Sequence, residues 1–142
     1  MKRRIEIIIM ICLVISTVVF GVLWQKAENN NEDIKWLAQT SAYQSYTQFL
    51  EFQENGRESA YWYGVADFRA FQNAYSLLTQ DTNKSTNRTY CNDFYGYLVL
   101  SPEECQTHIS EVVKVMNILA KDVEDENGYI RMFELRNLLK YG

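Results

Sequence analysis

Hydrophobic residues recur at spacings of three and four along most of the chain after residue 33, which is the period of an amphipathic helix. The first stripe comprises Ile34, Ala38, Ala42, Tyr46, Phe49 and Phe52. It predicts a helix that ends near the Glu-Asn-Gly sequence at residues 54–56. A second stripe comprises Tyr61, Val65, Phe68, Phe71, Tyr75 and Leu78. We expect the two helices to form an antiparallel hairpin, with Ala66, Ala70 and Ala74 on an adjacent face that another helix can approach closely.

The polar residues 79–88 predict an exposed loop. Within it, Asn83 and Asn87 match the Asn-x-Ser/Thr pattern of glycan acceptors, although chance matches in an Asn- and Thr-rich loop explain them as well. Residues 90–100 combine aromatic and β-branched residues typical of a strand with a spacing that also fits a short helix. Since a lone strand would have no partner for its backbone groups, we expect a helical or irregular segment.

The sequence Ser-Pro-Glu-Glu at residues 101–104 predicts a helix start, with Ser101 as N-cap and Pro102 in the first helical position. The stripe of this helix comprises Cys105, Ile109, Val112, Met116, Leu119, Ala120 and Val123. A final helix is expected from Tyr129 to about Leu139. Four amphipathic segments with short connections predict an all-α domain over residues 34–142, most simply a small four-helix bundle.

The amino-terminal part of the chain has a different pattern. Residues 7–24 carry no charge, and 18 residues of helix span about 27 Å, close to the thickness of a bilayer's hydrocarbon core. This run is longer than the apolar region of a cleavable signal peptide and lacks its small-residue cleavage site, so it predicts an uncleaved transmembrane signal anchor. The polar, Asn-rich residues 25–33 predict a juxtamembrane linker or a continuation of the helix.

The flanking charges predict the orientation of this anchor. Lys2, Arg3 and Arg4 precede the apolar run, whereas acidic residues outnumber basic ones just after it. The positive-inside rule therefore places the short basic segment 1–6 in the cytoplasm and the helical domain 34–142 outside the membrane.

Glu6 lies at the edge of the apolar run and has two interpretations. One is a carboxylate at the cytoplasmic headgroup layer, where the free-energy cost of the charge is small. The other follows from a resemblance to type IV pilin-like proteins, which have a basic leader, a long apolar helix and a glutamate near the helix start. The chain departs from that pattern because no Gly precedes the apolar segment, and because its downstream part is predicted to be helical where such proteins usually carry a sheet.

Composition and charge narrow the class of protein. The chain is 47% hydrophobic and 14% aromatic, which indicates a packed domain rather than a disordered tail. Residues 25–142 contain 11 Lys and Arg against 17 Asp and Glu, a formal net charge of −6. Because nucleic-acid binding requires clustered cations, and this portion has no basic patch, DNA and RNA are excluded as expected partners.

Two cysteines, Cys91 and Cys105, lie outside the predicted span, which contains Cys12. An oxidising exterior would allow a disulfide between Cys91 and Cys105, and two buried thiols are the alternative. His108 is the only histidine, so the sequence contains no zinc-ligand set and no Ser-His-Asp set, and a helix-surface position is expected for it. Asp67 is notable because it lies within a largely apolar and aromatic helix, where a cation is its natural partner.

Residues 123–134 resemble the twelve-residue calcium loop of EF-hand proteins. With Gly128 in the sixth position, Asp125 is third, Asn127 fifth and Glu134 twelfth. The first position, however, falls on Val123, which has no side-chain oxygen, so the principal ligand is missing. The ninth position falls on Arg131, whose positive charge would repel a calcium ion. We therefore interpret Asn127–Gly128 as a left-handed turn between two helices and assign no metal or cofactor.

The sequence thus predicts a single-pass membrane protein whose outer domain is a non-catalytic interaction or structural module of the cell envelope, with a protein partner. One alternative is an envelope enzyme whose residues, such as Asp67 and His108, converge only in the folded chain. The other is a ligand-responsive or calcium-responsive sensor module.

Overall fold

The structure, a computed structural model, describes residues 2–80 and 82–141, with the side chains of residues 19–80 and 82–139. Over these residues the chain is all-helical and contains six helices and no strand, which confirms the predicted all-α class. All six helices have residues in the domain 34–142, where the sequence predicted four. The helices are α1 (Lys2–Asn55), α2 (Glu58–Leu78), α3 (Ser85–Leu100), α4 (Pro102–Thr107), α5 (Ile109–Lys121) and α6 (Glu126–Tyr141).

The chain divides into two compact units, Met1–Asp33 and Ile34–Gly142. Residues 25–33 are helical and belong to α1. Of the predicted span 7–24, the side chains of residues 7–18 lie outside the described ones. Among the residues that the structure describes in full, no helix combines the length and hydropathy needed to cross a membrane.

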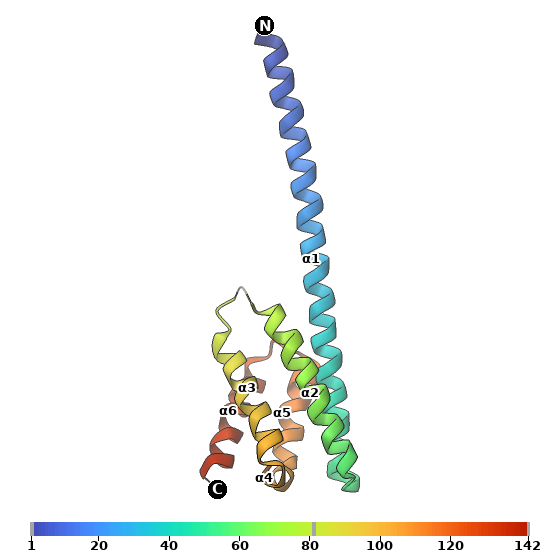
Figure 1. Ribbon diagram of the computed structural model, residues 1–142, viewed down its shortest axis with the longest axis vertical. Helices are drawn as coiled ribbons and strands as arrows, with labels where there is room; N and C mark the ends of the chain where they lie inside the picture. The colour runs from blue at the N-terminus through green and yellow to red at the C-terminus, as the bar shows by residue number, and fades with distance from the viewer. Residues whose placement is uncertain (1, 81, 142) are drawn as a thin grey trace. The chain divides into compact units, whose positions relative to one another are not determined.

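In the second unit, α1 and α2 form the predicted antiparallel hairpin and lie side by side (Figure 1). The turn between them contains Gly56, whose φ of 66° is accessible to glycine at little cost. The rings of Phe49 and Phe52 in α1 pack edge-on against Tyr61 in α2, with centroids 5.7 and 5.4 Å away. This hairpin forms one wall of the core.

These two helices approach each other closely at Gly64. A Cβ atom at Gly64 would lie 2.9 Å from ring carbons of Phe49, and Ser45 Oγ donates a hydrogen bond of 2.8 Å to the Gly64 carbonyl. Ala74 is buried, but Ala66 and Ala70 are exposed, so no helix of the described residues covers these two alanines. Those two alanines instead form part of an outer surface.

Residues 90–100 are helical, as expected, but α3 begins earlier, at Ser85. The exposed loop is therefore shorter than predicted, and Asn87 is buried inside the helix instead of exposed. A glycan could not be attached to this buried amide in the folded chain.

The helix predicted to start at Ser101 is divided in two at His108. Thr107 Oγ1 donates a hydrogen bond of 3.0 Å to the Glu103 carbonyl one turn earlier, and bonds of this type often bend helices. Ser101 does occupy the N-cap position of α4, but its side chain makes no capping hydrogen bond. The apolar stripe continues across the break, since Cys105, Val112 and Leu119 are all buried.

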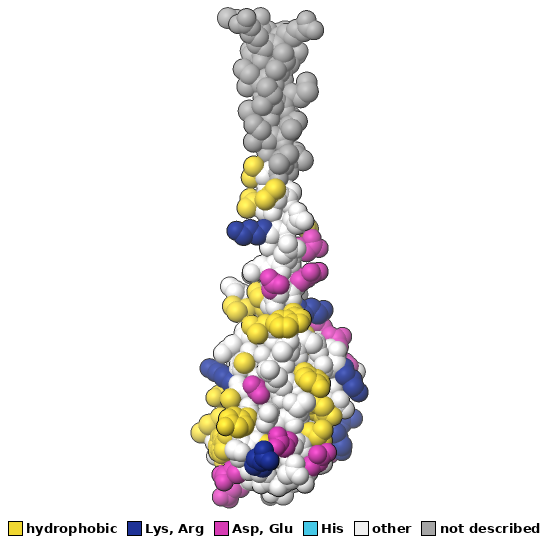
Figure 2. All heavy atoms as spheres, turned by 90° about the vertical axis from the view of Figure 1, so that its right-hand side faces the viewer, with side chains coloured by type: hydrophobic (Ala, Val, Ile, Leu, Met, Phe, Trp, Pro, Cys, Tyr) yellow, Lys and Arg dark blue, Asp and Glu magenta, His cyan; other side chains and the backbone are white. Residues whose placement is uncertain are grey.

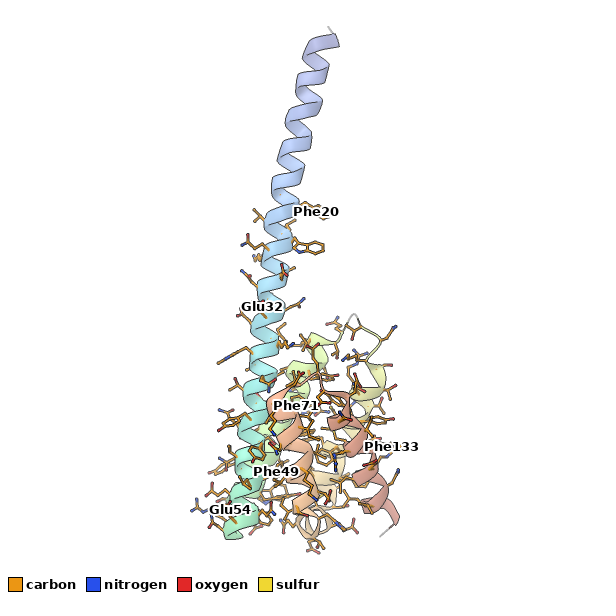
Figure 3. All side chains as sticks on the ribbon, turned by 180° about the vertical axis from the view of Figure 1, so that it is seen from behind. Phe20, Glu32, Phe49, Glu54, Phe71 and Phe133 are labelled. Carbon is orange, nitrogen blue, oxygen red and sulfur yellow. The ribbon has the colours of Figure 1, made fainter. Side chains whose placement is uncertain are left out.

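The core is rich in large side chains, including Phe49, Tyr61, Phe68, Phe71, Tyr75, Phe94, Leu98, Met116, Leu119, Tyr129, Met132 and Leu135. Figure 3 shows Phe49 and Phe71 among the helices of the second unit. Aromatic rings stack through the centre, with Tyr75 and Tyr129 only 4.9 Å apart. Such a core fixes the outer faces of the helices in place.

Candidate functional site

Cys91 and Cys105 are free, buried thiols in the structure, and no disulfide joins them. Each lies beside a different tyrosine: Cys91 is near Tyr129, and Cys105 is near Tyr61, whose hydroxyl donates a hydrogen bond of 2.9 Å to the Leu98 carbonyl. Burial raises the pKa of Cys105 to about 11, and it raises the pKa of the more deeply buried Cys91 by a larger amount. Both are therefore protonated at neutral pH, and neither is an activated nucleophile.

The segment that resembles a calcium loop is mostly helix. Because α6 begins at Glu126, the fourth to twelfth positions of the supposed loop are helical, and Glu134 lies about 12 Å along the axis from Glu126. Asp125 is the cap of this helix, since its Oδ1 accepts a hydrogen bond of 2.9 Å from the Asn127 N–H. Within the described residues, no group of three or more His, Cys, Asp and Glu side chains could hold a metal ion.

Gly128 also has a different role from the predicted left-handed turn, because Gly56 is the glycine with positive φ among the described residues. A Cβ atom at Gly128 would lie 2.5 Å from Leu119 Cδ2. The missing side chain therefore lets the first turn of α6 pack directly onto α5.

Asp67 and His108, the residues proposed for an enzyme alternative, belong to no group of three or more possible metal ligands among the described residues. Asp67 is half-buried on α2, where burial raises the pKa of its carboxyl group. Arg69, two residues further along α2, donates a hydrogen bond of 2.7 Å to Gln72 and lies over the ring of Tyr95. His108 is half-exposed at the junction of α4 and α5.

A polar cluster that the sequence did not predict joins the α2–α3 loop to the start of α6. Asn87 Nδ2 donates hydrogen bonds to Tyr75 Oη at 3.2 Å and to Glu126 Oε2 at 2.9 Å. Lys84 Nζ lies 3.0 Å from the other carboxylate oxygen of Glu126. These two donors lower the pKa of Glu126, and the carboxylate in turn raises the pKa of Lys84. Glu126 also lies at the positive end of the α6 dipole, so the cluster is self-contained and structural.

The outward side of α2 carries an unusual set of exposed apolar side chains. We call this set the α2 outer face; it comprises Trp62, Tyr63, Ala66, Ala70 and Leu77. The exposed fraction of its large side chains is 41% for Trp62, 63% for Tyr63 and 59% for Leu77. The spacing of these residues places them within about 100° of the helix circumference, opposite the buried stripe.

The outward side of α1 in the second unit also carries aromatic residues. Trp36 and Tyr43 are 68% and 56% exposed, and their spacing of seven residues puts them on one side of the helix. Figure 2 shows several groups of hydrophobic side chains on the α1 side of this unit, with charged side chains between them. The aromatic residues of the hairpin thus serve two purposes, with one set in the core and another exposed on its outer side.

The α2 outer face is the candidate interaction surface, because it is apolar and carried by a rigid helix. Of the residues singled out from the sequence, Ala66 and Ala70 are part of it, whereas Trp62, Tyr63 and Leu77 were missed. The helical spacing of residues 62, 66, 70 and 77 was the available signal. Comparisons of the chain with protein-family models, with curated proteins and with solved structures found no match.

Proposed function

We propose that residues 34–142 form a non-catalytic interaction module of the cell envelope, held at the membrane by a single-pass anchor at residues 7–24. In this proposal the basic segment 1–6 is cytoplasmic and the helical domain is extracytoplasmic. The uncharged run of 18 residues and the positive charges before it support the anchor. The partner is a protein with an apolar, aromatic-accepting surface.

The α2 outer face is the observation that carries the interaction proposal. Trp and Tyr are enriched at protein interfaces, where they supply large contact areas with little loss of side-chain entropy. The opposite side of α2 is fixed by the core residues Phe68, Phe71 and Tyr75, so this surface is organised before any partner arrives. A partner would gain about 25 cal/mol for each Å² of apolar area that it removes from water.

Site-specific photocrosslinking in native membranes tests the interaction. The full chain carries a photoreactive amino acid at Tyr63 or, as a control, at the exposed Lys114 on α5. We expect a discrete protein adduct from position 63 that is absent from position 114 and is lost when Trp62 is replaced by Ser. Equal adducts from both positions, or none from position 63, would contradict the proposal.

The anchor is tested separately by fractionation. We expect the full chain to stay with membranes after alkaline extraction and a chain lacking residues 7–24 to be released. A reporter enzyme that is active only outside the cytoplasm, fused after Gly142, should be active in the full chain. Release of the intact chain by alkali would contradict the anchor without affecting the evidence for the interaction surface.

A further inference from the structure

A surface hollow of about 380 Å³ lies between α3 and α6. Its lining includes Asp93, Gly96, Tyr97 and Leu100 from α3, and Arg136 from α6. This volume is within the range of small-molecule sites in proteins. The hollow is separate from the α2 outer face, so a ligand bound in it is independent of the proposed interaction module.

Gly96 is the first indication that the hollow has a use. The fold accounts for three other glycines of this unit: Gly56 has positive φ, and Gly64 and Gly128 lie against side chains of neighbouring helices. A Cβ atom at Gly96, by contrast, would meet nothing within 4 Å. Glycine inside a helix costs about 1 kcal/mol relative to alanine, and here no packing contact offsets that cost. The missing side chain instead keeps the hollow open.

The charged groups of the hollow are the second indication. Arg136 Nη1 lies 3.2 Å from Asp93 Oδ2, and the two side chains are 31% and 34% exposed. This ion pair joins one nitrogen to one oxygen, whereas a guanidinium has five N–H donors and a carboxylate accepts about four hydrogen bonds. Both groups therefore retain capacity for a ligand without breaking their pair. The guanidinium also lies over the ring of Phe133, 5.9 Å from its centroid, which limits its movement.

We propose that this hollow binds a free α-amino acid with an apolar side chain. The ligand's ammonium group binds Asp93, its carboxylate binds Arg136, and its side chain lies against Tyr97 and Leu100. The four charges then alternate in sign around a ring, so each charge has two opposite neighbours. An α-amino acid fits this arrangement because its two charged groups are attached to one carbon, as close together as Asp93 and Arg136 are.

The same charges disfavour ligands that carry only one of the two groups. A carboxylate without an ammonium group would bring an anion next to Asp93, and an amine without a carboxylate would bring a cation next to Arg136. Leu100 is 83% exposed, so covering it with the apolar side chain of a ligand lowers the free energy of binding. The site therefore selects a zwitterion with an apolar side chain.

Isothermal titration of the full chain in detergent with leucine tests the proposal, with 4-methylpentanoate and 3-methylbutylamine as analogues that lack one charged group. We expect saturable binding of leucine and affinities for both analogues that are lower by about tenfold or more, or about 1.4 kcal/mol. Absence of saturable leucine binding up to about 10 mM, or equal binding of either analogue, would overturn the proposal.

Filling the hollow provides the matched variant. Gly96→Leu introduces a side chain without changing any charge, and we expect it to reduce leucine affinity by about tenfold or more. Ser110→Leu, which introduces the same side chain at an exposed position of α5, should leave leucine binding unchanged. Circular dichroism verifies that both variants are folded, and Gly96→Ala, which adds only the Cβ atom, replaces Gly96→Leu if the larger side chain prevents folding. Wild-type affinity in the folded Gly96 variant would show that leucine binds elsewhere and overturn the assignment.

Discussion

Two glycines of the second unit, Gly64 and Gly96, have opposite surroundings and therefore predict opposite effects of the same substitution. Gly64→Ala would place a methyl group 2.9 Å from the ring of Phe49, so we expect overpacking to lower the free energy of unfolding by about 1–3 kcal/mol. Gly96→Ala adds a methyl group to open space within a helix, and we expect a rise of about 0.5–1 kcal/mol. Urea denaturation followed by circular dichroism measures both.

Each glycine variant serves as the control for the other, because both make the same chemical change within a helix. A stabilised Gly64→Ala chain would mean that Phe49 moves aside at no cost. A destabilised Gly96→Ala chain would mean that the open space beside Gly96 does not exist in solution.

Glu126 predicts a pH dependence of stability whose sign follows from its lowered pKa. Asn87 and Lys84 favour the ionised carboxylate in the folded chain, so its pKa is below the usual 4.5. This contribution to stability is fully present above the pKa of the unfolded chain and is lost as the pH falls through the folded pKa. We expect the stability difference between the wild type and Glu126→Gln to be constant near neutral pH and to shrink below about pH 4.5.

Denaturation curves at a series of pH values provide this measurement, since carboxylates common to both chains cancel in the difference. Glu134→Gln removes an exposed carboxylate from the same helix and serves as the control for the loss of one charge. A wild-type advantage that grows on acidification would show that the pairing with Asn87 and Lys84 is absent.

At the scale of elements, Gln39 connects α1 to the end of α5. Its Nε2 donates to the Leu119 carbonyl at 3.1 Å and to the Ala120 carbonyl, and its Oε1 accepts a hydrogen bond of 3.1 Å from the Val123 N–H. The last carbonyls of a helix have no partner within the helix, so one side chain satisfies the end of α5. We expect Gln39→Ala to lower the free energy of unfolding by about 1–3 kcal/mol.

Gln44→Ala is the matched control for this prediction, because it removes the same side chain from an exposed position of the same helix. Thermal unfolding measures the stability of both variants. A larger loss for Gln39→Ala than for Gln44→Ala is then due to the hydrogen bonds with α5 and not to the removal of a glutamine from α1. Equal stability of the two variants would show that water replaces Gln39 at the end of α5 without cost.

The helices were predictable because the core lies on one side of each, so the period of three and four survives in residues such as Val65, Phe68 and Phe71. The ends of the helices were less predictable, because tertiary contacts determine them. Asn127–Gly128 suits a left-handed turn as well as a first helical turn, and the packing of Gly128 on Leu119 selects the second. Whether Cys91 and Cys105 meet likewise depends on how α3 and α4 pack, which their spacing does not specify.

The candidate surfaces were less predictable than the helices. The periodic pattern separates buried from unburied sides, but it does not show which unburied apolar residues another element covers. Ala66 and Ala70 illustrate this, since the same spacing fits a covered and an open face. The hollow beside Gly96 requires α3 and α6 to pack next to each other, and the sequence contains no sign of that pairing.

For the molecule as a whole, the two buried thiols report on global unfolding. We expect iodoacetamide to modify Cys91 and Cys105 rapidly in urea without reductant and only slowly in the folded chain. Burial blocks access, and a pKa of about 11 lowers the thiolate fraction of Cys105 at neutral pH by a factor on the order of 10². Peptide mapping by mass spectrometry identifies each modified cysteine.

This labelling also tests the state of the two cysteines. If they formed a disulfide, neither would be modified in urea until a reductant was added, and Cys12 alone would react. Rapid modification of Cys91 in the folded chain would instead show that the centre of the core opens far more often than its packing implies.

The contact between Gln39 and α5 has a consequence for how the chain is made. It joins residues 80 to 84 positions apart, and the nearby pair Lys35–Glu124 joins residues 89 positions apart. A ribosome adding about 5–20 residues per second takes several seconds to cover that separation. During this interval α1 can pair with α2 but not with α5, so the hydrogen bonds of Gln39 to the end of α5 are among the last contacts of the domain to form.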